Sequence, residues 1–78
     1  MTQADACLAL RGVPCPLNYI RSRLALEKLA PGGWLQIDLD PGEPEQMVSS
    51  GLSREGHLVQ RCSSPGNGVR LLVQRASG

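Results

Sequence analysis

Cys15 is the residue of this sequence best placed for chemistry, because it stands between Pro14 and Pro16 where a helix is expected to begin. The first turn of a helix has free N–H groups and about half a positive charge, and both favour a thiolate over a thiol. In such places the pKa of a cysteine can fall well below its ordinary value of about 8.5. Pro16 suits the first helical position, where its missing N–H costs nothing. These residues predict an activated nucleophile on a rigid corner of the protein.

A buried, inert cysteine is the alternative that the local pattern leaves open. Other thiol chemistries fit the sequence less well. There is no Cys-x-x-Cys pair for thioredoxin-type exchange. His57 is the only histidine, and nothing marks an oxyanion hole for a Cys-His hydrolase. A zinc site made from His57 and the three cysteines would lack the paired ligand spacing of such sites.

The remaining candidate side chains have simpler explanations. Cys7 lies in an apolar run and is expected to pack in the core, whereas Cys62, near a strand end, is expected to be an exposed spectator. We expect His57 to be a hydrogen-bonding surface residue. Asp40 precedes Pro41 and ends a strand, which can bring its carboxylate near the reactive edge.

The hydrophobic pattern predicts elements in the order β-α-β-α-β-β. The strands span 7–10, 34–40, 57–62 and 69–75, and the helices span 16–29 and 43–55. Leu35, Ile37 and Leu39 alternate with polar residues, which is typical of a strand with one buried face. A Pro-Gly-Gly segment ends the first helix, and Asn67 followed by Gly68 is typical of a hairpin turn.

Each predicted helix has an apolar stripe that we expect to face the sheet. In the first helix the stripe is Leu17, Ile20 and Leu24, and in the second it is Met47, Val48 and Leu52. Leu26 and Leu29 fall outside the first stripe, so the apolar face of that helix is expected to be broad or partly exposed.

Right-handed crossovers place both helices on one face of the sheet. We therefore expect an α/β (α+β) fold: a single domain over 1–78, built as a two-layer sandwich with a mixed four-stranded sheet. Helical crossovers are expected to join parallel neighbours. The other face of the sheet would present Trp34, Gln36, Asp38, Arg70 and Gln74 to solvent or to a partner.

Length and charge limit the function. A chain of 78 residues buries only about 60–65% of its unfolded surface, so chemistry is expected at an edge and not in a large cavity. With a formal charge of +1, one Trp, one Tyr and no Phe, the chain lacks the features of a nucleic-acid-binding protein. It has no membrane-spanning apolar run and no signal-peptide pattern. We expect a cytoplasmic protein with free thiols.

The segment LALRGVPCPLNYIRSRLALEKLAPGGWLQI resembles the TusA/SirA-like sulfur carrier family, and the resemblance continues more loosely through Asp40-Pro41 and Gly56-His57. It implies that Cys15 accepts sulfane sulfur as a persulfide from a cysteine desulfurase or another donor protein. It further implies that Cys15 passes the sulfur to an acceptor protein that serves tRNA thiolation, molybdenum-cofactor synthesis or sulfur metabolism. No cofactor is implied beyond the transient persulfide.

The sequence departs from the usual family motif Cys-Pro-x-Pro, because Asn18 replaces the second proline. We expect the carrier cysteine to survive this change, with a less rigid first turn and a polar group added near the thiol. That turn is expected to belong to the docking surface, which makes the choice of partner sensitive to Asn18. Gly12 would permit the tight turn before Cys15, and Arg11 is either an anion-holding neighbour of the thiol or a solvated turn residue.

A non-catalytic module is the alternative function. The same sandwich could bind a protein or RNA through its open face, with Trp34, Arg61 and Arg70 as contacts. Near-neutral charge and scarce aromatic residues count against RNA.

Overall fold

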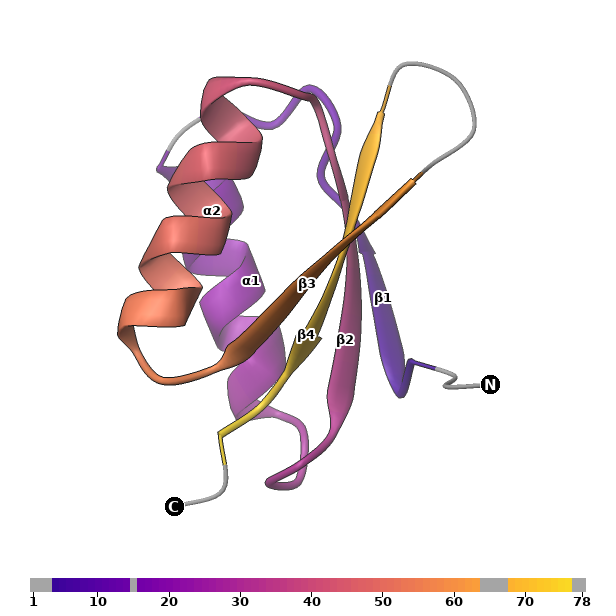
Figure 1. Ribbon diagram of the computed structural model, residues 1–78, viewed down its shortest axis with the longest axis vertical. Helices are drawn as coiled ribbons and strands as arrows, with labels where there is room; N and C mark the ends of the chain where they lie inside the picture. Colours follow the sequence, from indigo (N-terminus) through magenta and orange to yellow (C-terminus); the bar gives the residue numbers. More distant parts are fainter. Residues whose placement is uncertain (1–3, 15, 64–67, 77–78) are drawn as a thin grey trace.

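The computed structural model describes residues 4–14, 16–63 and 68–76, and it has one mixed sheet with both helices packed on the same face (Figure 1). The elements are β1 (Ala6–Ala9), α1 (Leu17–Glu27), β2 (Trp34–Leu39), α2 (Glu43–Arg54), β3 (Leu58–Ser63) and β4 (Val69–Gln74). The predicted two-layer sandwich and element order are confirmed. Of the predicted hairpin turn, Asn67 lies outside the described residues and Gly68 lies inside them.

The strand order is β1-β2-β4-β3, with β1 parallel to β2 and β4 antiparallel to both of its neighbours. The expectation of parallel neighbours is therefore right for the first crossover and wrong for the second, since β4 lies between β2 and β3. A central strand is paired on both sides, so the strand with the most apolar inner face suits the central place. Val69, Leu71 and Val73 give β4 such a face, whereas the corresponding face of β3 includes Arg61.

The core lies between the sheet and the helices. Its buried apolar residues are Leu10, Leu26, Leu35, Ile37, Leu39, Val48, Leu52, Val69, Leu71 and Val73. The predicted inner face of β2 is confirmed, and it is fully buried. In the described part of the chain, neither helix is long and apolar enough to cross a membrane.

The buried face of α1 is not the predicted one. Leu17, Ile20 and Leu24 are 46%, 44% and 53% exposed. The helix instead buries Asn18, Ser22 and Leu26, which are 0%, 0% and 1% exposed. These two polar residues are satisfied locally, because the Ser22 hydroxyl donates to the Asn18 carbonyl over 2.8 Å and the Asn18 Oδ1 accepts from the Tyr19 N–H over 2.7 Å. Polar groups with such partners can be buried at little cost.

The buried stripe of α2 is confirmed for two of its three predicted members. Val48 and Leu52 are fully buried, whereas Met47 is 52% exposed. Gly42 precedes the helix, and Glu43 and Glu45 lie in its first turn, where acidic side chains compensate the positive end.

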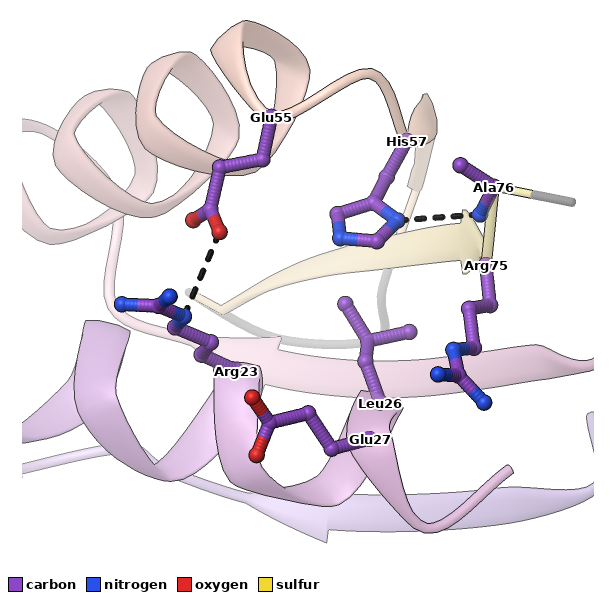
Figure 2. A pocket seen from close by; sticks show the side chains of 7 residues that line it. All are labelled: Arg23, Leu26, Glu27, Glu55, His57, Arg75 and Ala76. Atoms are coloured by element: carbon purple, nitrogen blue, oxygen red, sulfur yellow. Dashed lines mark hydrogen bonds and ion pairs between the residues drawn. The ribbon is translucent and has the colours of Figure 1, made fainter. Parts of the chain in front are cut away.

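The carboxyl-terminal ends of both helices and the end of β4 enclose a pocket of about 220 Å³ (Figure 2). It is lined by Arg23, Leu26, Glu27, Glu55, His57, Arg75 and Ala76. The Ala76 N–H donates to Nδ1 of His57 over 3.0 Å, so the predicted hydrogen-bonding role of His57 is confirmed. The Arg75 guanidinium donates to the Leu29 carbonyl. These contacts tie the chain after β4 to the helix layer.

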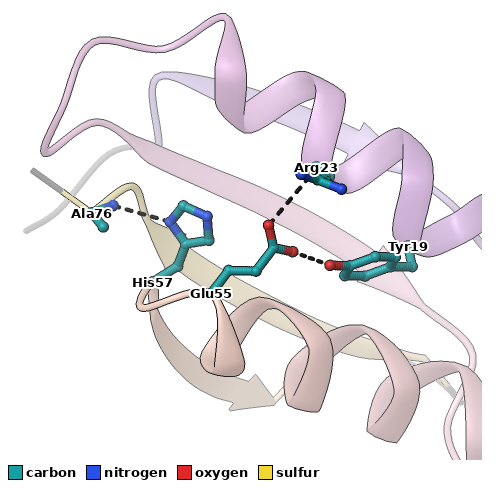
Figure 3. A network of polar contacts seen from close by, with 5 residues as sticks. All are labelled: Tyr19, Arg23, Glu55, His57 and Ala76. Atoms are coloured by element: carbon teal, nitrogen blue, oxygen red, sulfur yellow. Dashed lines mark hydrogen bonds and ion pairs between the residues drawn. The ribbon is translucent and has the colours of Figure 1, made fainter. Parts of the chain in front are cut away.

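Tyr19 and Glu55 join the two helices (Figure 3). The Tyr19 hydroxyl donates to the Glu55 carboxylate, which also lies 3.2 Å from Nε of Arg23. The Tyr19 ring packs directly over Gly51 of α2: a Cβ at Gly51 would stand 2.5 Å from Cε1 and 2.9 Å from Cδ1 of the ring. Glycine is therefore required here by the close approach of the two helices.

Leu26→Ala and Leu24→Ala test which face of α1 is buried. We expect Leu26→Ala to lower the free energy of unfolding by about 2–5 kcal/mol, because it empties a filled core position. Leu24→Ala removes the same atoms from an exposed position and should cost less than about 1 kcal/mol. Urea unfolding of the two variants measures both values, and equal losses would contradict the assignment.

Gly51→Ala tests the contact between the helices. Alanine favours a helix over glycine by about 1 kcal/mol, but overpacking against the Tyr19 ring should cost about 1–3 kcal/mol. We expect a net loss of stability in wild type. In a Tyr19→Ala background the ring is gone, so Gly51→Ala should become stabilising. An unchanged sign between the two backgrounds, measured by thermal or urea unfolding, would show that the ring does not limit this position.

Candidate functional site

The turn between β1 and α1 is fixed at both ends by backbone hydrogen bonds. The Leu10 N–H donates to the Asp38 carbonyl over 2.8 Å, and the Val13 N–H donates to the Leu10 carbonyl over 3.1 Å. Between them, Gly12 has a φ of +79°, a left-handed conformation that favours glycine. The predicted tight turn at Gly12 is therefore confirmed.

Asp40 binds this turn from the end of β2. Its Oδ2 accepts from the Gly12 N–H over 2.7 Å, and its Oδ1 lies 3.6 Å from Nε of Arg11. The predicted closeness of Asp40 to this edge is confirmed. The Arg11 side chain also lies against Gly68, where a Cβ would come within 3.3 Å of Nε of Arg11. The carboxyl ends of β1 and β2 thus lie beside the start of β4 at one end of the sheet. This is the end at which α/β sheets usually bind ligands.

Cys15 lies outside the described residues, and the chain on both sides of it is anchored to α1. The Pro14 carbonyl accepts from the Asn18 N–H over 3.2 Å, and the Pro16 carbonyl accepts from the Ile20 N–H over 3.0 Å. Pro16 has φ −92° and stands just before the helix, which begins at Leu17, one residue later than predicted. The first turn of α1 contains no acidic residue, so no negative charge of that turn compensates the positive helix end.

The Asn18 side chain is fully buried, so it adds no polar group to the protein surface. That the first turn belongs to a docking surface stays a prediction. The Asn18 Oδ1 accepts from the Tyr19 N–H, one of the N–H groups that a helix leaves without an intrahelical partner. Its own N–H reaches the Pro14 carbonyl, a bond that proline cannot make. The rigidity that a second proline would supply is thus replaced by hydrogen bonds.

The two described cysteines differ from their predicted exposure, although Cys62 lies near a strand end as predicted. Cys7 is exposed and not in the core, because the alternation of β1 turns Ala6 and Leu8 toward the helices. Cys62 is half-buried, opposite Arg70 on the open sheet face. Since β2 and β4 lie between their strands, the two thiols are far apart. The described residues contain no cluster of three metal-ligating side chains.

The open sheet face holds its predicted polar residues, but not Arg61. Nε of Arg70 lies 2.9 Å from Oδ1 of Asp38, and this hydrogen bond raises the pKa of Arg70, which stays charged. Arg61 is opposite Leu71, on the helix side of the sheet, and its Nε lies 2.6 Å from Oε2 of Glu45. The proposed binding surface of Trp34, Arg61 and Arg70 therefore does not form.

Three apolar side chains are exposed near this end of the sheet, although the sequence pattern predicted that they would be buried. Leu17 and Ile20 lie in the first half of α1, and Met47 lies in the first half of α2. The helices run parallel, and both amino ends lie at the end of the sheet where β2 ends (Figure 1). In the sequence, this surface is indicated only by α1, which has more apolar residues than a single buried stripe needs.

Three comparisons identify relatives. The family model described as "Sulfurtransferase TusA" matches residues 8–75. A protein of Archaeoglobus fulgidus described as "Putative sulfur carrier protein" is 32% identical over 57 residues, which are 73% of this chain and 65% of that protein. The chain thus spans less than two thirds of this relative's length. The crystal structure of a SirA-like protein from Desulfitobacterium hafniense shares the fold, with a TM-score of 0.81, 18% identity, and coverage of 92% of this chain and 99% of that chain.

The family match begins within β1 and ends just after β4, and so includes the whole candidate site. The chain therefore belongs to the TusA family of sulfurtransferases, the sulfur carrier family that the Cys-Pro segment resembles.

Proposed function

We propose that this protein is a cytoplasmic persulfide carrier that uses Cys15. The single observation that carries the proposal is that the first turn of α1, directly after this cysteine in the chain, contains no acidic residue. A thiolate at that place is favoured by the positive end of the helix dipole. Asp40 supports the site by fixing Gly12 and Arg11 in the preceding turn.

The transfer is a thiol–persulfide exchange. The Cys15 thiolate attacks the outer sulfur of a cysteine persulfide on the donor, a cysteine desulfurase or a related protein. A new S–S bond forms on Cys15 while the donor's S–S bond breaks, and the donor cysteine leaves as a thiolate. The outer sulfur of the Cys15 persulfide is then attacked in the same way by an acceptor protein. No outside oxidant or reductant is needed in either step.

The acceptor belongs to one of the routes that family members serve: tRNA thiolation, molybdenum-cofactor synthesis or sulfur metabolism. Protein donors and acceptors suit the surroundings of the site, where Leu17, Ile20 and Met47 expose apolar surface. Arg11 is partly neutralised by Asp40. Its role toward an anion at Cys15 is therefore secondary to that of the helix end.

Sulfur loading is tested by intact mass after incubation with a cysteine desulfurase and free cysteine. We expect wild type to gain the mass of sulfur, a gain that dithiothreitol removes, because the sulfane sulfur is held by a reducible S–S bond. Cys15→Ser should gain none. Cys7→Ser and Cys62→Ser are the matched controls and should load normally. A wild type that gains no sulfur, or a gain that disappears in Cys62→Ser, would refute the proposed site.

Alkylation by iodoacetamide tests the electrostatics. Cys15 should react faster at neutral pH than the exposed Cys7, and its rate should reach half-maximum below pH ~8.5, because the helix end favours the thiolate. Leu17→Glu adds a carboxylate to the first turn and should slow the reaction, whereas Leu17→Gln should not. Equal rates for Cys15 and Cys7 would mean that exposure alone governs reactivity. Equal rates in the two Leu17 variants would show that the helix end does not cause the high reactivity of Cys15.

A further inference from the structure

A groove of about 410 Å³ runs between α1 and β1, on the helix side of the sheet at its β1 edge. It is lined by Ala6, Leu8, Arg21, Leu24, Ala25, Lys28 and Leu29. Its apolar members come from both elements. Two cations stand among them, and no carboxylate is among the described residues that line it. The groove therefore has an apolar interior and a positive rim.

The strand beside this groove has a free edge. β1 is an outer strand, and within the described residues only β2 pairs with it (Figure 1). The Leu10 N–H, directly after β1, donates to a carbonyl of β2. Since the backbone groups of a strand point alternately to its two sides, those of Ala6 and Leu8 also point to β2, and those of Cys7 and Ala9 point to the free edge. The side chains of Ala6 and Leu8 face the groove.

The opposite edge of the sheet is protected. Arg61 of β3 lies on the helix side of the sheet, where its largely exposed side chain pairs with Glu45 of α2 over 2.6 Å. The groove beside that strand is lined mainly by polar residues, including Ser49, Ser50 and Ser53. A charged side chain on an edge strand is a common device against pairing with another chain. No such device stands among the described residues that line the groove at β1.

We propose that β1 and α1 together bind an extended segment of a partner protein by strand addition. The segment would pair with the backbone of Cys7 and Ala9, place alternate apolar side chains in the groove beside Ala6 and Leu8, and set carboxylates against Arg21 and Lys28. A second copy of this chain is disfavoured as the occupant, because a two-fold pairing of β1 with β1 brings these cations toward their own copies. This surface is separate from the sulfur chemistry of Cys15, and its test needs no sulfur donor.

Two fluorescently labelled synthetic peptides of equal length test the proposal. Both alternate valine with a charged residue, which is glutamate in the first peptide and lysine in the second. We expect the acidic peptide to bind more tightly in fluorescence polarisation, because its carboxylates meet the positive rim. Amide shifts in ¹⁵N NMR spectra should then concentrate at Cys7 and Ala9. Equal binding of the two peptides, binding of neither, or shifts confined to β3 would each overturn the proposal.

Exposed variants locate the contacts without disturbing the core. Arg21→Glu and Lys28→Glu should each weaken binding of the acidic peptide by about threefold or more. Arg54→Glu on α2 is the charge-matched control and should leave it unchanged. Leu24→Ala should weaken binding, whereas Met47→Ala, at a similarly exposed position, should not. Loss of binding in both controls, or a peptide-free dimer in sedimentation that protects the β1 amides, would also overturn the proposal.

Discussion

The burial of β2 is the constraint on which the other parts of this protein depend. Leu35, Ile37 and Leu39 are fully buried, so the strand has only one register that keeps its inner face from water. That register fixes β1 on one side and β4 on the other. It also brings Asp40, at the end of the strand, to Gly12 and Arg11. The geometry of the turn between β1 and α1 is in this sense set by the core.

The sequence predicted the layers and the element order, because these follow from strong local patterns. Strand alternation in β2 and β4 depends only on a period of two, and both inner faces were identified correctly. The tight turn followed from Gly12, whose positive φ few other residues accept. The order of β3 and β4 could not be predicted in this way, since it is decided by contacts between distant segments.

The other errors concern which face of an element is buried. α1 carries leucine on several sides, so apolar periodicity cannot select its buried stripe. The buried stripe includes Asn18 and Ser22, whose side chains make hydrogen bonds inside the helix that lower the cost of burying them. Cys7 and Arg61 were misplaced because a shift of one residue in a short edge strand reverses every side chain. Such shifts are settled by pairing, which no local pattern shows.

The two parallel helices differ at their positive ends, and this difference links folding to charge at position 15. The first turn of α2 contains Glu43 and Glu45, whereas that of α1 contains no acidic residue. A negative charge at the start of α1 lowers the free energy of the folded chain by about 0.3–1 kcal/mol relative to the unfolded chain, which has no helix end. By thermodynamic linkage, the folded chain holds that charge more readily than the unfolded chain does. The attraction between a negative charge and the start of α1 would thus have two consequences. It would help the folded chain to hold the charge, and it would make the folded chain more stable.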